Sequence, residues 1–244
     1  MLQLSKRMQA VADLAEEVDV LADVGTDHAY IPIYMAECGK LKKAIAMDIN
    51  QGPLMRARDH IQQYGVSDYI ETRLSDGLNA LKPGEADTIV IAGMGGALME
   101  RILTQGETVA HMARRLVLQP QSELLAFRCF LLEHGHQIVA EDMVYDENKF
   151  YTIMAAKPMQ VNQQVSGCCL SQTELKYGPL LIQKRHPVLK LYLQRQQKQK
   201  QEILEQLSVN AKRDISRRRF QVEQDLAEIE KVLQLWKEQS YEMQ

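Results

Sequence analysis

The 244-residue sequence predicts an α/β fold, in which a mostly parallel seven-stranded sheet is followed by a C-terminal helical hairpin. Three observations predict it. Short apolar runs recur over the first 158 residues, with helical segments between most of them. The last two runs are separated by only a tight turn. From Pro187 onward the pattern changes to long helical segments with apolar residues at a 4-3 spacing.

Seven segments have the composition of strands. They are 18–25, 42–49, 69–77, 87–96, 114–120, 137–145 and 149–158. Helical segments separate the first five, so we expect these to be parallel, because parallel strands need a crossover connection. Only Asp146, Glu147 and Asn148 join the last two, which predicts an antiparallel hairpin at the edge of the sheet.

The chain beyond Pro158 first becomes polar and then helical, so we divide it into a sheet domain, 1–158, and a connector with a helical domain, 159–244. In a first helix the 4-3 spacing covers positions 189, 193, 196, 200, 203, 207 and 210, of which 196, 200 and 210 are polar. In a second helix it covers Val222, Leu226, Ile229, Leu233 and Trp236 without a break. Two such helices, joined near 208–216, predict an antiparallel coiled-coil hairpin.

Charge is distributed unevenly along the chain. The segment 184–220 holds 11 Lys or Arg against 3 Asp or Glu, whereas the rest of the chain holds 18 against 29. Near the expected turn of the hairpin the basic residues are Lys212, Arg213, Arg217, Arg218 and Arg219. A basic extension on an acidic body favours a polyanionic partner, which could reach these side chains through its phosphates. A hairpin that serves only for packing or dimerisation remains an alternative.

Composition limits the class of protein. Hydrophobic residues make up 45% and charged residues 25%, ordinary values for a globular protein. No apolar run reaches about 18 residues, and the N-terminal segment lacks the compact apolar core of a signal peptide. The four cysteines include no C-x-x-C pair, and Cys168 and Cys169 are adjacent. We therefore expect a reduced, cytoplasmic protein without a membrane span or a metal site.

Four strand ends carry the residues of a candidate site. The carboxyl ends of parallel strands meet at one edge of a sheet, where ligands bind. These ends carry Asp23, Gly25, Asp27 and His28; Asp48 and Ile49; Asp76 and Gly77; and Gly93, Met94, Gly95 and Gly96. Each segment alone matches an ordinary turn or helix start. Together, at successive strand ends, they predict a ligand site.

The residue types at these ends favour one cofactor over another. The carboxylate of Asp48 can accept hydrogen bonds from both hydroxyls of a ribose, and Asp76 can accept one from an adenine amine. Gly25 allows a ligand to approach the backbone. The dinucleotide pattern G-x-G-x-x-G is absent, and acids at this loop would repel a pyrophosphate. The acids Asp23 and Asp27 suit instead the sulfonium and ammonium groups of S-adenosylmethionine.

Six segments together resemble a known family. They read LSKRMQAVADL, LADVGTDHAYIP, DIN, SDGL, IAGMGGALM and LVLQP, and with the basic helical tail they are similar to the bacterial tRNA (adenine-22-N1) methyltransferases. The resemblance implies a Rossmann-like class I fold, S-adenosylmethionine as cofactor, and methylation of N1 of an adenosine in the D-arm region of tRNA. It also implies that Asp27 is the catalytic acid, that Asp76 contacts the cofactor adenine and that Asp48 binds its ribose.

The remaining candidate residues follow from this assignment. For the cofactor they are His28, Ile49, Gly77, Gly93 and Met94; for the RNA they are Lys6, Arg7, Gly95, Gln119, Pro120, Arg213, Arg217, Arg218 and Arg219, with Tyr30 and Tyr151 as stacking candidates. Adenine N1 already offers a lone pair, so Asp27 would stabilise charge that develops on the base or accept a proton from N6. A role for Asp27 in orienting the cofactor remains open.

Two other functions remain as alternatives. The first is a non-catalytic scaffold that keeps the fold and uses the hairpin to hold RNA or protein, although the intact ring of acids and glycines argues against it. The second is a methyltransferase for proteins or small molecules, with the hairpin as a dimer interface. We expect a tRNA-binding monomer rather than a dimer.

Overall fold

The computed structural model describes residues 1–159, 170–209 and 216–242, with side chains described as far as 207 in the first long helix of the hairpin and over 216–236 in the second. Arg213, Lys212, Cys168 and Cys169 therefore lie outside the described side chains. The chain forms two compact units, Met1–Lys176 and Tyr177–Gln244, and each is considered by itself.

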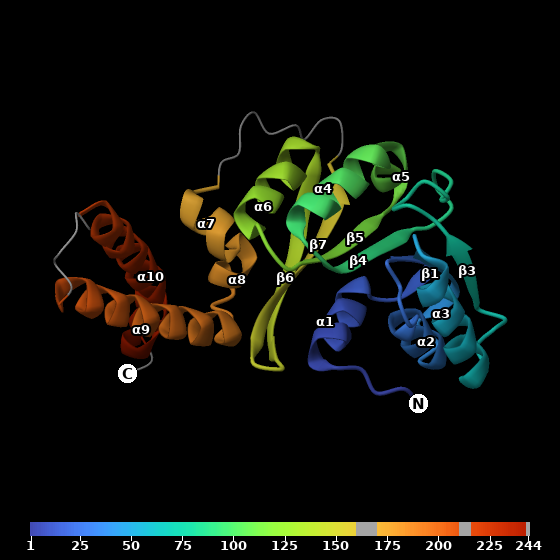
Figure 1. Ribbon diagram of the computed structural model, residues 1–244, viewed down its shortest axis with the longest axis horizontal. Helices are drawn as coiled ribbons and strands as arrows, with labels where there is room; N and C mark the ends of the chain where they lie inside the picture. Colours follow the sequence, from blue (N-terminus) through green and yellow to red (C-terminus); the bar gives the residue numbers. More distant parts are fainter. Residues whose placement is uncertain (160–169, 210–215, 243–244) are drawn as a thin grey trace. The chain divides into compact units, whose positions relative to one another are not determined.

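Seven strands form a single sheet in the first unit (Figure 1). They are β1 (Val18–Val24), β2 (Leu41–Asp48), β3 (Ile70–Leu74), β4 (Thr88–Met94), β5 (Arg115–Pro120), β6 (His136–Asp146) and β7 (Lys149–Pro158). All seven predicted strands are confirmed within a few residues. The third is shorter than predicted because Ser75, Asp76 and Gly77 form a turn, and the fourth because Gly96 begins a helix.

The order of the strands is β3-β2-β1-β4-β5-β7-β6. The pairings among β1 to β5 are parallel, whereas β7 is antiparallel to both β5 and β6. The predicted hairpin is thus confirmed, and its second strand lies between β5 and the edge strand β6. Glu147 and Asn148 both have positive φ, 46° and 63°, as a two-residue type I′ turn requires.

Helices cover both faces of this sheet (Figure 1). Those on one face are α1 (Lys6–Ala15), α2 (Tyr30–Glu37) and α3 (Gln51–Gln63), and those on the other are α4 (Gly96–Gln105), α5 (Glu107–Met112) and α6 (Leu124–Glu133). This three-layer arrangement explains why the central strands are apolar on both faces. Among the described residues, no helix combines the length and the apolar character needed to cross a membrane.

The first unit extends past the sheet to include α7 (Gln172–Tyr177), whose residues up to Lys176 belong to it. The sequence predicted a division at Pro158. The structure extends the first unit to Lys176 because of Arg128, which is fully buried in α6. Its guanidinium pairs with buried Glu141 at 2.9 Å and donates from Nη1 to the carbonyl oxygens of Leu175 and Lys176, at 2.7 and 3.3 Å. These bonds attach α7 to the sheet unit.

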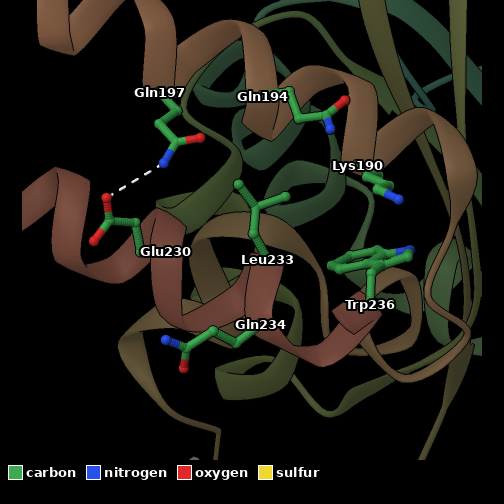
Figure 2. A pocket seen from close by; sticks show the side chains of 7 residues that line it. All are labelled: Lys190, Gln194, Gln197, Glu230, Leu233, Gln234 and Trp236. Atoms are coloured by element: carbon green, nitrogen blue, oxygen red, sulfur yellow. Dashed lines mark hydrogen bonds between the residues drawn. The ribbon is translucent and has the colours of Figure 1, made fainter. Parts of the chain in front are cut away.

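The second unit contains α8 (Pro179–Gln183), α9 (Pro187–Val209) and α10 (Ser216–Glu242). Gln197 donates to Glu230 at 3.3 Å (Figure 2), and Lys200 pairs with Asp225 at 2.5 Å, so α9 and α10 run antiparallel as the helical hairpin predicts. Lys200 is a charged residue at a position where the 4-3 pattern calls for an apolar one, and its charge is balanced by Asp225. Whether the pair supercoils as a coiled coil stays a prediction.

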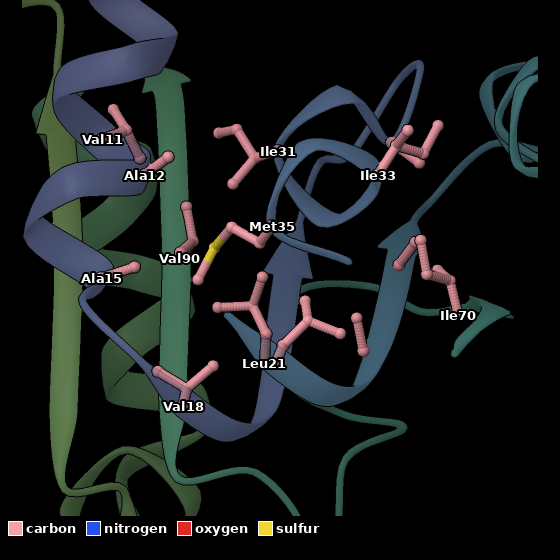
Figure 3. Close-up of a cluster of buried hydrophobic side chains, with 14 of the residues drawn as sticks. Val11, Ala12, Ala15, Val18, Leu21, Ile31, Ile33, Met35, Ile70 and Val90 are labelled. Atoms are coloured by element: carbon pink, nitrogen blue, oxygen red, sulfur yellow. The ribbon is translucent and has the colours of Figure 1, made fainter. Parts of the chain in front are cut away.

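One part of the core of the first unit lies between β1, β4 and the helices α1 and α2 (Figure 3). Leu21 and Val90 of the two central strands are fully buried, and Met35 of α2 packs beside them. On α1 the buried residues Ala10, Val11, Ala12 and Ala15 are small, which lets the helix approach the sheet closely. This packing fixes the carboxyl ends of β1 and β4, where the site residues lie.

Candidate functional site

The loop after β1 turns sharply beside a buried acid. Asp23 is 5% exposed, and its Oδ2 accepts a 2.6 Å hydrogen bond from Oγ1 of Thr26. Burial raises the pKa of Asp23 to about 6; the Thr26 hydrogen bond opposes this rise and neighbouring Asp48 adds to it. A cation bound nearby would favour the charged carboxylate. The protonation state of Asp23 would therefore respond to a positive ligand bound beside it.

Asp27 lies at the mouth of this loop. Its backbone has a φ of 41°, uncommon for a non-glycine residue and accompanied by a φ of 55° at Ala29. The half-exposed carboxylate pairs with the Arg56 guanidinium of α3 and lies 3.3 Å from Nε2 of His28. Arg56 had no signal in the sequence, because it lies on α3, 29 positions farther along the chain than the loop residue Asp27. The pair holds the Asp27 carboxylate at the open edge of the sheet.

Three rings connect the same loop to α3. His28, Tyr30 and His60 are mutually stacked, with centroids 5.0 to 5.2 Å apart. His60 Nδ1 also lies 3.3 Å from the carbonyl oxygen of His28. His28 thus serves as a positioning element between Asp27 and the two other rings.

The ends of β2 and β3 present acids beside an exposed apolar surface. Asp48 Oδ1 accepts from the backbone N–H of Asn50 at 2.8 Å, and Ile49 is 57% exposed. Asp76 is exposed in the turn that Ser75 stabilises by donating to the carbonyl of Gly77 at 2.8 Å. An exposed apolar side chain next to a carboxylate suits an adenosine, whose base has apolar faces and whose ribose donates hydrogen bonds.

The end of β4 meets both the first loop and α1. The φ of Gly25 is 76°, a conformation that favours glycine, and a Cβ on residue 25 would also have to displace the Met94 methyl group. Gly93, with a φ of 80°, donates its N–H to Oε1 of Gln119 at 3.1 Å. The same Oε1 accepts from Nη1 of Arg7 at 3.1 Å. Gln119 therefore connects the β4 loop to α1.

Arg7 is held from three sides. Besides Gln119, its backbone N–H donates to Oδ2 of Asp146 at 3.1 Å, and its guanidinium lies 5.5 Å from the centroid of the Tyr151 ring. Gln119 is fully buried, and Pro120 is buried too, so neither side chain lies on the surface. In the structure the Gln119 side chain contacts Arg7 and Gly93, and its predicted role in substrate binding stays a prediction.

A cavity of about 620 Å³ adjoins this edge of the sheet. Its walls comprise the segment 2–5, Arg7, Met8, Tyr30, His60, Gln63, Tyr64, Gln121, Asp146, Glu147 and Tyr151. Tyr30 and His60 also stack on His28, next to Asp27, so this cavity adjoins the acid-rich loop at these rings. Tyr30 and Tyr151, the predicted stacking residues, both line it.

The structure brings most predicted cofactor residues to one edge, because β3, β2, β1 and β4 are adjacent and parallel. The predicted RNA-binding residues are dispersed. Lys6 is exposed at the start of α1 without lining the cavity, and Gly95 caps α4. Arg217, Arg218 and Arg219 are exposed in the first turn of α10, in the other unit, and Arg219 pairs with Glu223 at 2.8 Å.

Comparison with known proteins agrees with this geometry. A family model described as a methyltransferase domain matches residues 4–154. The tRNA (adenine(22)-N(1))-methyltransferase of Bacillus subtilis is 37% identical over 208 residues, which cover 85% of this chain and 87% of the relative. The chain belongs to the tRNA (adenine(22)-N(1))-methyltransferase family. Its seven-stranded fold and the helices on both faces are those of the Rossmann-like methyltransferases that it resembles.

Two solved structures of similar proteins contain the cofactor or its product. A Streptococcus pneumoniae protein in complex with S-adenosyl-L-methionine is 33% identical, with a TM-score of 0.81, and the match covers 95% of this chain and all of that chain. A Mycoplasma protein, M. capricolum TrmK, in complex with S-adenosyl-homocysteine is 26% identical, with a TM-score of 0.77, 96% of this chain and 99% of that chain being covered. Members of this family therefore use S-adenosylmethionine.

The residues of this chain fit that cofactor. Buried Asp23 lies in β1 and the half-exposed Asp27 carboxylate lies in the loop that follows, and both acids would stabilise a cationic group bound beside them. Asp48 has one carboxylate oxygen on the Asn50 amide and can turn the other to a ribose. Ile49 supplies the apolar surface for a base. Acidic side chains of this kind suit a cationic ligand and disfavour a pyrophosphate.

The link through Gln119 leads to a first prediction. Replacing Gln119 with Leu removes the acceptor for both Arg7 and Gly93. We expect kcat/KM for tRNA to fall about tenfold, with cofactor affinity changed less than twofold, since a displaced loop misplaces the acceptor. Gln119→Glu keeps an acceptor and should restore most of the activity. The exposed residue Gln137 offers a control, and an equal loss in Gln137→Leu, or no recovery in Gln119→Glu, would contradict a positioning role.

Proposed function

We propose that this protein transfers the methyl group of S-adenosylmethionine to N1 of adenine 22 in the D-arm region of tRNA. Membership of the family, with 37% identity to the B. subtilis enzyme, supports the reaction and the substrate. The observation that carries the assignment to residues is the meeting of the acid-rich loop, Asp23 to Asp27, with the aromatic cavity at one edge of the sheet.

Cofactor binding is assigned to the ends of β1 to β4. Asp48 would bind the ribose hydroxyls, Ile49 would pack on the adenine, and Asp76 would accept from its amine. Asp23 and the loop at Gly25 would hold the cationic methionine portion, beside Gly93 and Met94. His28 and Gly77 shape this site rather than contact the methyl group. When bound, the cofactor supplies an electrophilic methyl group on a sulfonium.

The acceptor adenine is assigned to the cavity beside Tyr30, His60 and Tyr151. Its volume of about 620 Å³ lies within the usual range for ligand pockets, and its aromatic walls can stack on a base. A base that is methylated on its Watson–Crick edge must leave its pair to enter, at a cost of roughly a few kcal/mol. Contacts elsewhere on the tRNA must offset that cost.

Asp27 is assigned to the reacting edge of the base. In the transfer, the N1 lone pair forms the new C–N bond while the S–C bond breaks, and the pair of electrons of that bond returns to sulfur. The base then carries the positive charge. The Asp27 carboxylate, held by Arg56 and His28, would stabilise that charge or accept the N6 proton.

The test is transfer of labelled methyl from S-adenosylmethionine to unmodified tRNA, followed by mapping of the modified nucleotide. Label at N1 of adenine 22 is the expected result. A tRNA with guanosine at position 22 is the matched control and should receive none. Label on N6, or on protein but not RNA, would overturn the proposed function.

The buried acid gives a second prediction, on pH. In the free protein the pKa of Asp23 is raised to about 6, so at about pH 5 most Asp23 is protonated and neutral. A cationic ligand favours the ionised form, and binding must then release the proton. Cofactor affinity should fall about tenfold between pH 7.5 and pH 5, measured by titration calorimetry. Asp23→Asn should remove this dependence, and a wild-type affinity that stays constant over that range would contradict it.

The proposal also covers how the enzyme contacts tRNA, its oligomeric state and its location. The exposed arginines Arg217, Arg218 and Arg219, with Arg213 and Lys6, would contact tRNA phosphates. We expect the enzyme to act as a monomer in the cytoplasm, where its substrate is. Light scattering with and without tRNA would test the monomer, since a dimer in the absence of RNA would return the hairpin to an assembly role.

A further inference from the structure

A second cavity lies within the helical unit, between α9 and α10 (Figure 2). Its volume is about 360 Å³, and none of its lining residues belongs to the sheet unit. Lys190 and Gln194 come from α9, and Leu233 and Trp236 from α10. The site assigned above to the methyl transfer does not use it.

One wall of this cavity is an aromatic ring that is fixed in place. Trp236 Nε1 donates to the carbonyl oxygen of Arg185 at 3.0 Å, which satisfies the polar edge of the indole. The ring is half-buried, and Leu233, 9% exposed, lies beside it (Figure 2). An immobilised indole next to an apolar side chain offers a flat surface on which another ring can stack.

The opposite side of the cavity is polar. Lys190 and Gln194 are exposed and one helical turn apart on α9 (Figure 2). Among the residues that the structure describes, neither side chain has a hydrogen-bonding or ionic partner. By contrast, Gln197 and Glu230, which also line the cavity, are already bonded to each other, Gln197 donating to the Glu230 carboxylate at 3.3 Å. The cavity thus combines a stacking surface, an uncommitted amide and an uncommitted cation.

The charge of the unit indicates which class of ligand fits. Tyr177–Gln244 contains 13 Lys or Arg and 9 Asp or Glu, a net charge of +4, whereas Met1–Lys176 contains 16 and 23, a net charge of −7. A polyanion is therefore attracted to the helical unit and repelled by the sheet unit. Aromatic rings with neighbouring cations and amides are the features that bind unstacked nucleotides.

We propose that this cavity binds an unstacked nucleotide of the tRNA, at a position other than the methylated adenine. The base stacks on Trp236, the Gln194 amide contacts the edge of the base, and Lys190 pairs with its phosphate. Stacking tolerates any base, so the site contributes affinity more than sequence choice. The proposal rests on the proposed function, because it takes tRNA as the substrate.

The sole tryptophan of the chain makes the test direct, because its emission reports on this cavity alone. Unmodified tRNA titrated into the full-length protein, without cofactor, should quench Trp236 emission saturably. In filter binding, Lys190→Gln and Gln194→Ala should weaken tRNA binding about threefold each, and Trp236→Ala about tenfold. Turnover at saturating tRNA should stay unchanged in all three.

Matched controls lie on the same helix. Lys198→Gln and Gln201→Ala remove the same groups from exposed positions that do not line the cavity, and they should bind tRNA within about 1.5-fold of their parent. If tRNA binds without altering the emission, and the cavity variants match these controls, the proposal is overturned. Emission that changes with protein concentration alone, together with a dimer in light scattering, also overturns it, with a second copy as the occupant.

A failure of the proposed nucleotide site can be told apart from a failure of the proposed function. Failure of the methyl-transfer assay on tRNA would overturn the proposed function whatever the emission shows. Methylation of adenine 22 with no change in Trp236 emission on binding would overturn only the nucleotide site. Lys190 and Gln194 are exposed, so their variants still test the nucleotide site if Trp236→Ala does not fold.

Discussion

Replacing Asp27 with Asn is expected to lower kcat about 100- to 1000-fold while leaving the dissociation constant for S-adenosylmethionine within about threefold. The amide keeps the size of the side chain and loses the charge that faces the base. In the structure the carboxylate lies at the open edge, between Arg56 and His28, beside the rings that border the larger cavity. Single-turnover rates with saturating tRNA and cofactor measure the effect on the chemical step.

Two further variants serve as controls for Asp27→Asn. Asp48→Asn alters the acid assigned to the ribose, so it should weaken cofactor binding about tenfold with a smaller effect on the rate at saturation. Arg56→Gln leaves Asp27 in place but removes its partner, and it should lose about tenfold in kcat. Parallel losses of cofactor affinity and turnover in Asp27→Asn would instead make Asp27 a cofactor ligand.

Reversing the charges of Arg217, Arg218 and Arg219 to Glu is the second change with a large expected effect. We expect tRNA affinity at about 0.15 M salt to fall at least tenfold, because three phosphate contacts become repulsive. The slope of log K against log salt should become shallower by about 2. Arg219 is already paired with Glu223, so Arg217 and Arg218 should account for most of the loss.

The control for this variant must carry the same net charge. Lys43, Lys82 and Lys157 are exposed on the sheet unit and are not among the candidate site residues, and their triple replacement by Glu changes the charge of the protein equally. Filter binding of both triple variants over a range of salt separates local contact from overall repulsion. Equal affinities of the two would mean that the arginines act only through net charge, and the hairpin would then be structural.

The strands were predictable because each is a short apolar run between polar turns. The signal for β1 to β5 is local, and the hairpin of β6 and β7 follows from a connection too short for a crossover. The position of β7 was not predictable, since nothing near Lys149 indicates that it pairs with β5 rather than lying at the edge. Strand pairing is a long-range contact that the local sequence does not encode.

The candidate site was also predictable in part from the sequence. Acids and glycines directly after strands must lie at one edge when the strands are parallel, so Asp23, Asp48 and Asp76 could be grouped without a structure. Their partners could not. Arg56 reaches Asp27 from another helix, and Gln119 turns inward to Arg7, 112 positions away, although its place at the end of β5 suggested a surface contact.

The sequence by itself determined the fold class, the two-part organisation and the choice of cofactor, because hydrophobic period, connection length and loop charge are local properties. The tertiary structure alone decided which groups hold the site together: Arg56 and His28 on Asp27, Gln119 between Arg7 and Gly93, and the rings of Tyr30 and His60 along the cavity. The physical reason is that these contacts join segments far apart in the chain. Their partners are chosen by the packing of helices on the sheet, which leaves no local pattern in the sequence.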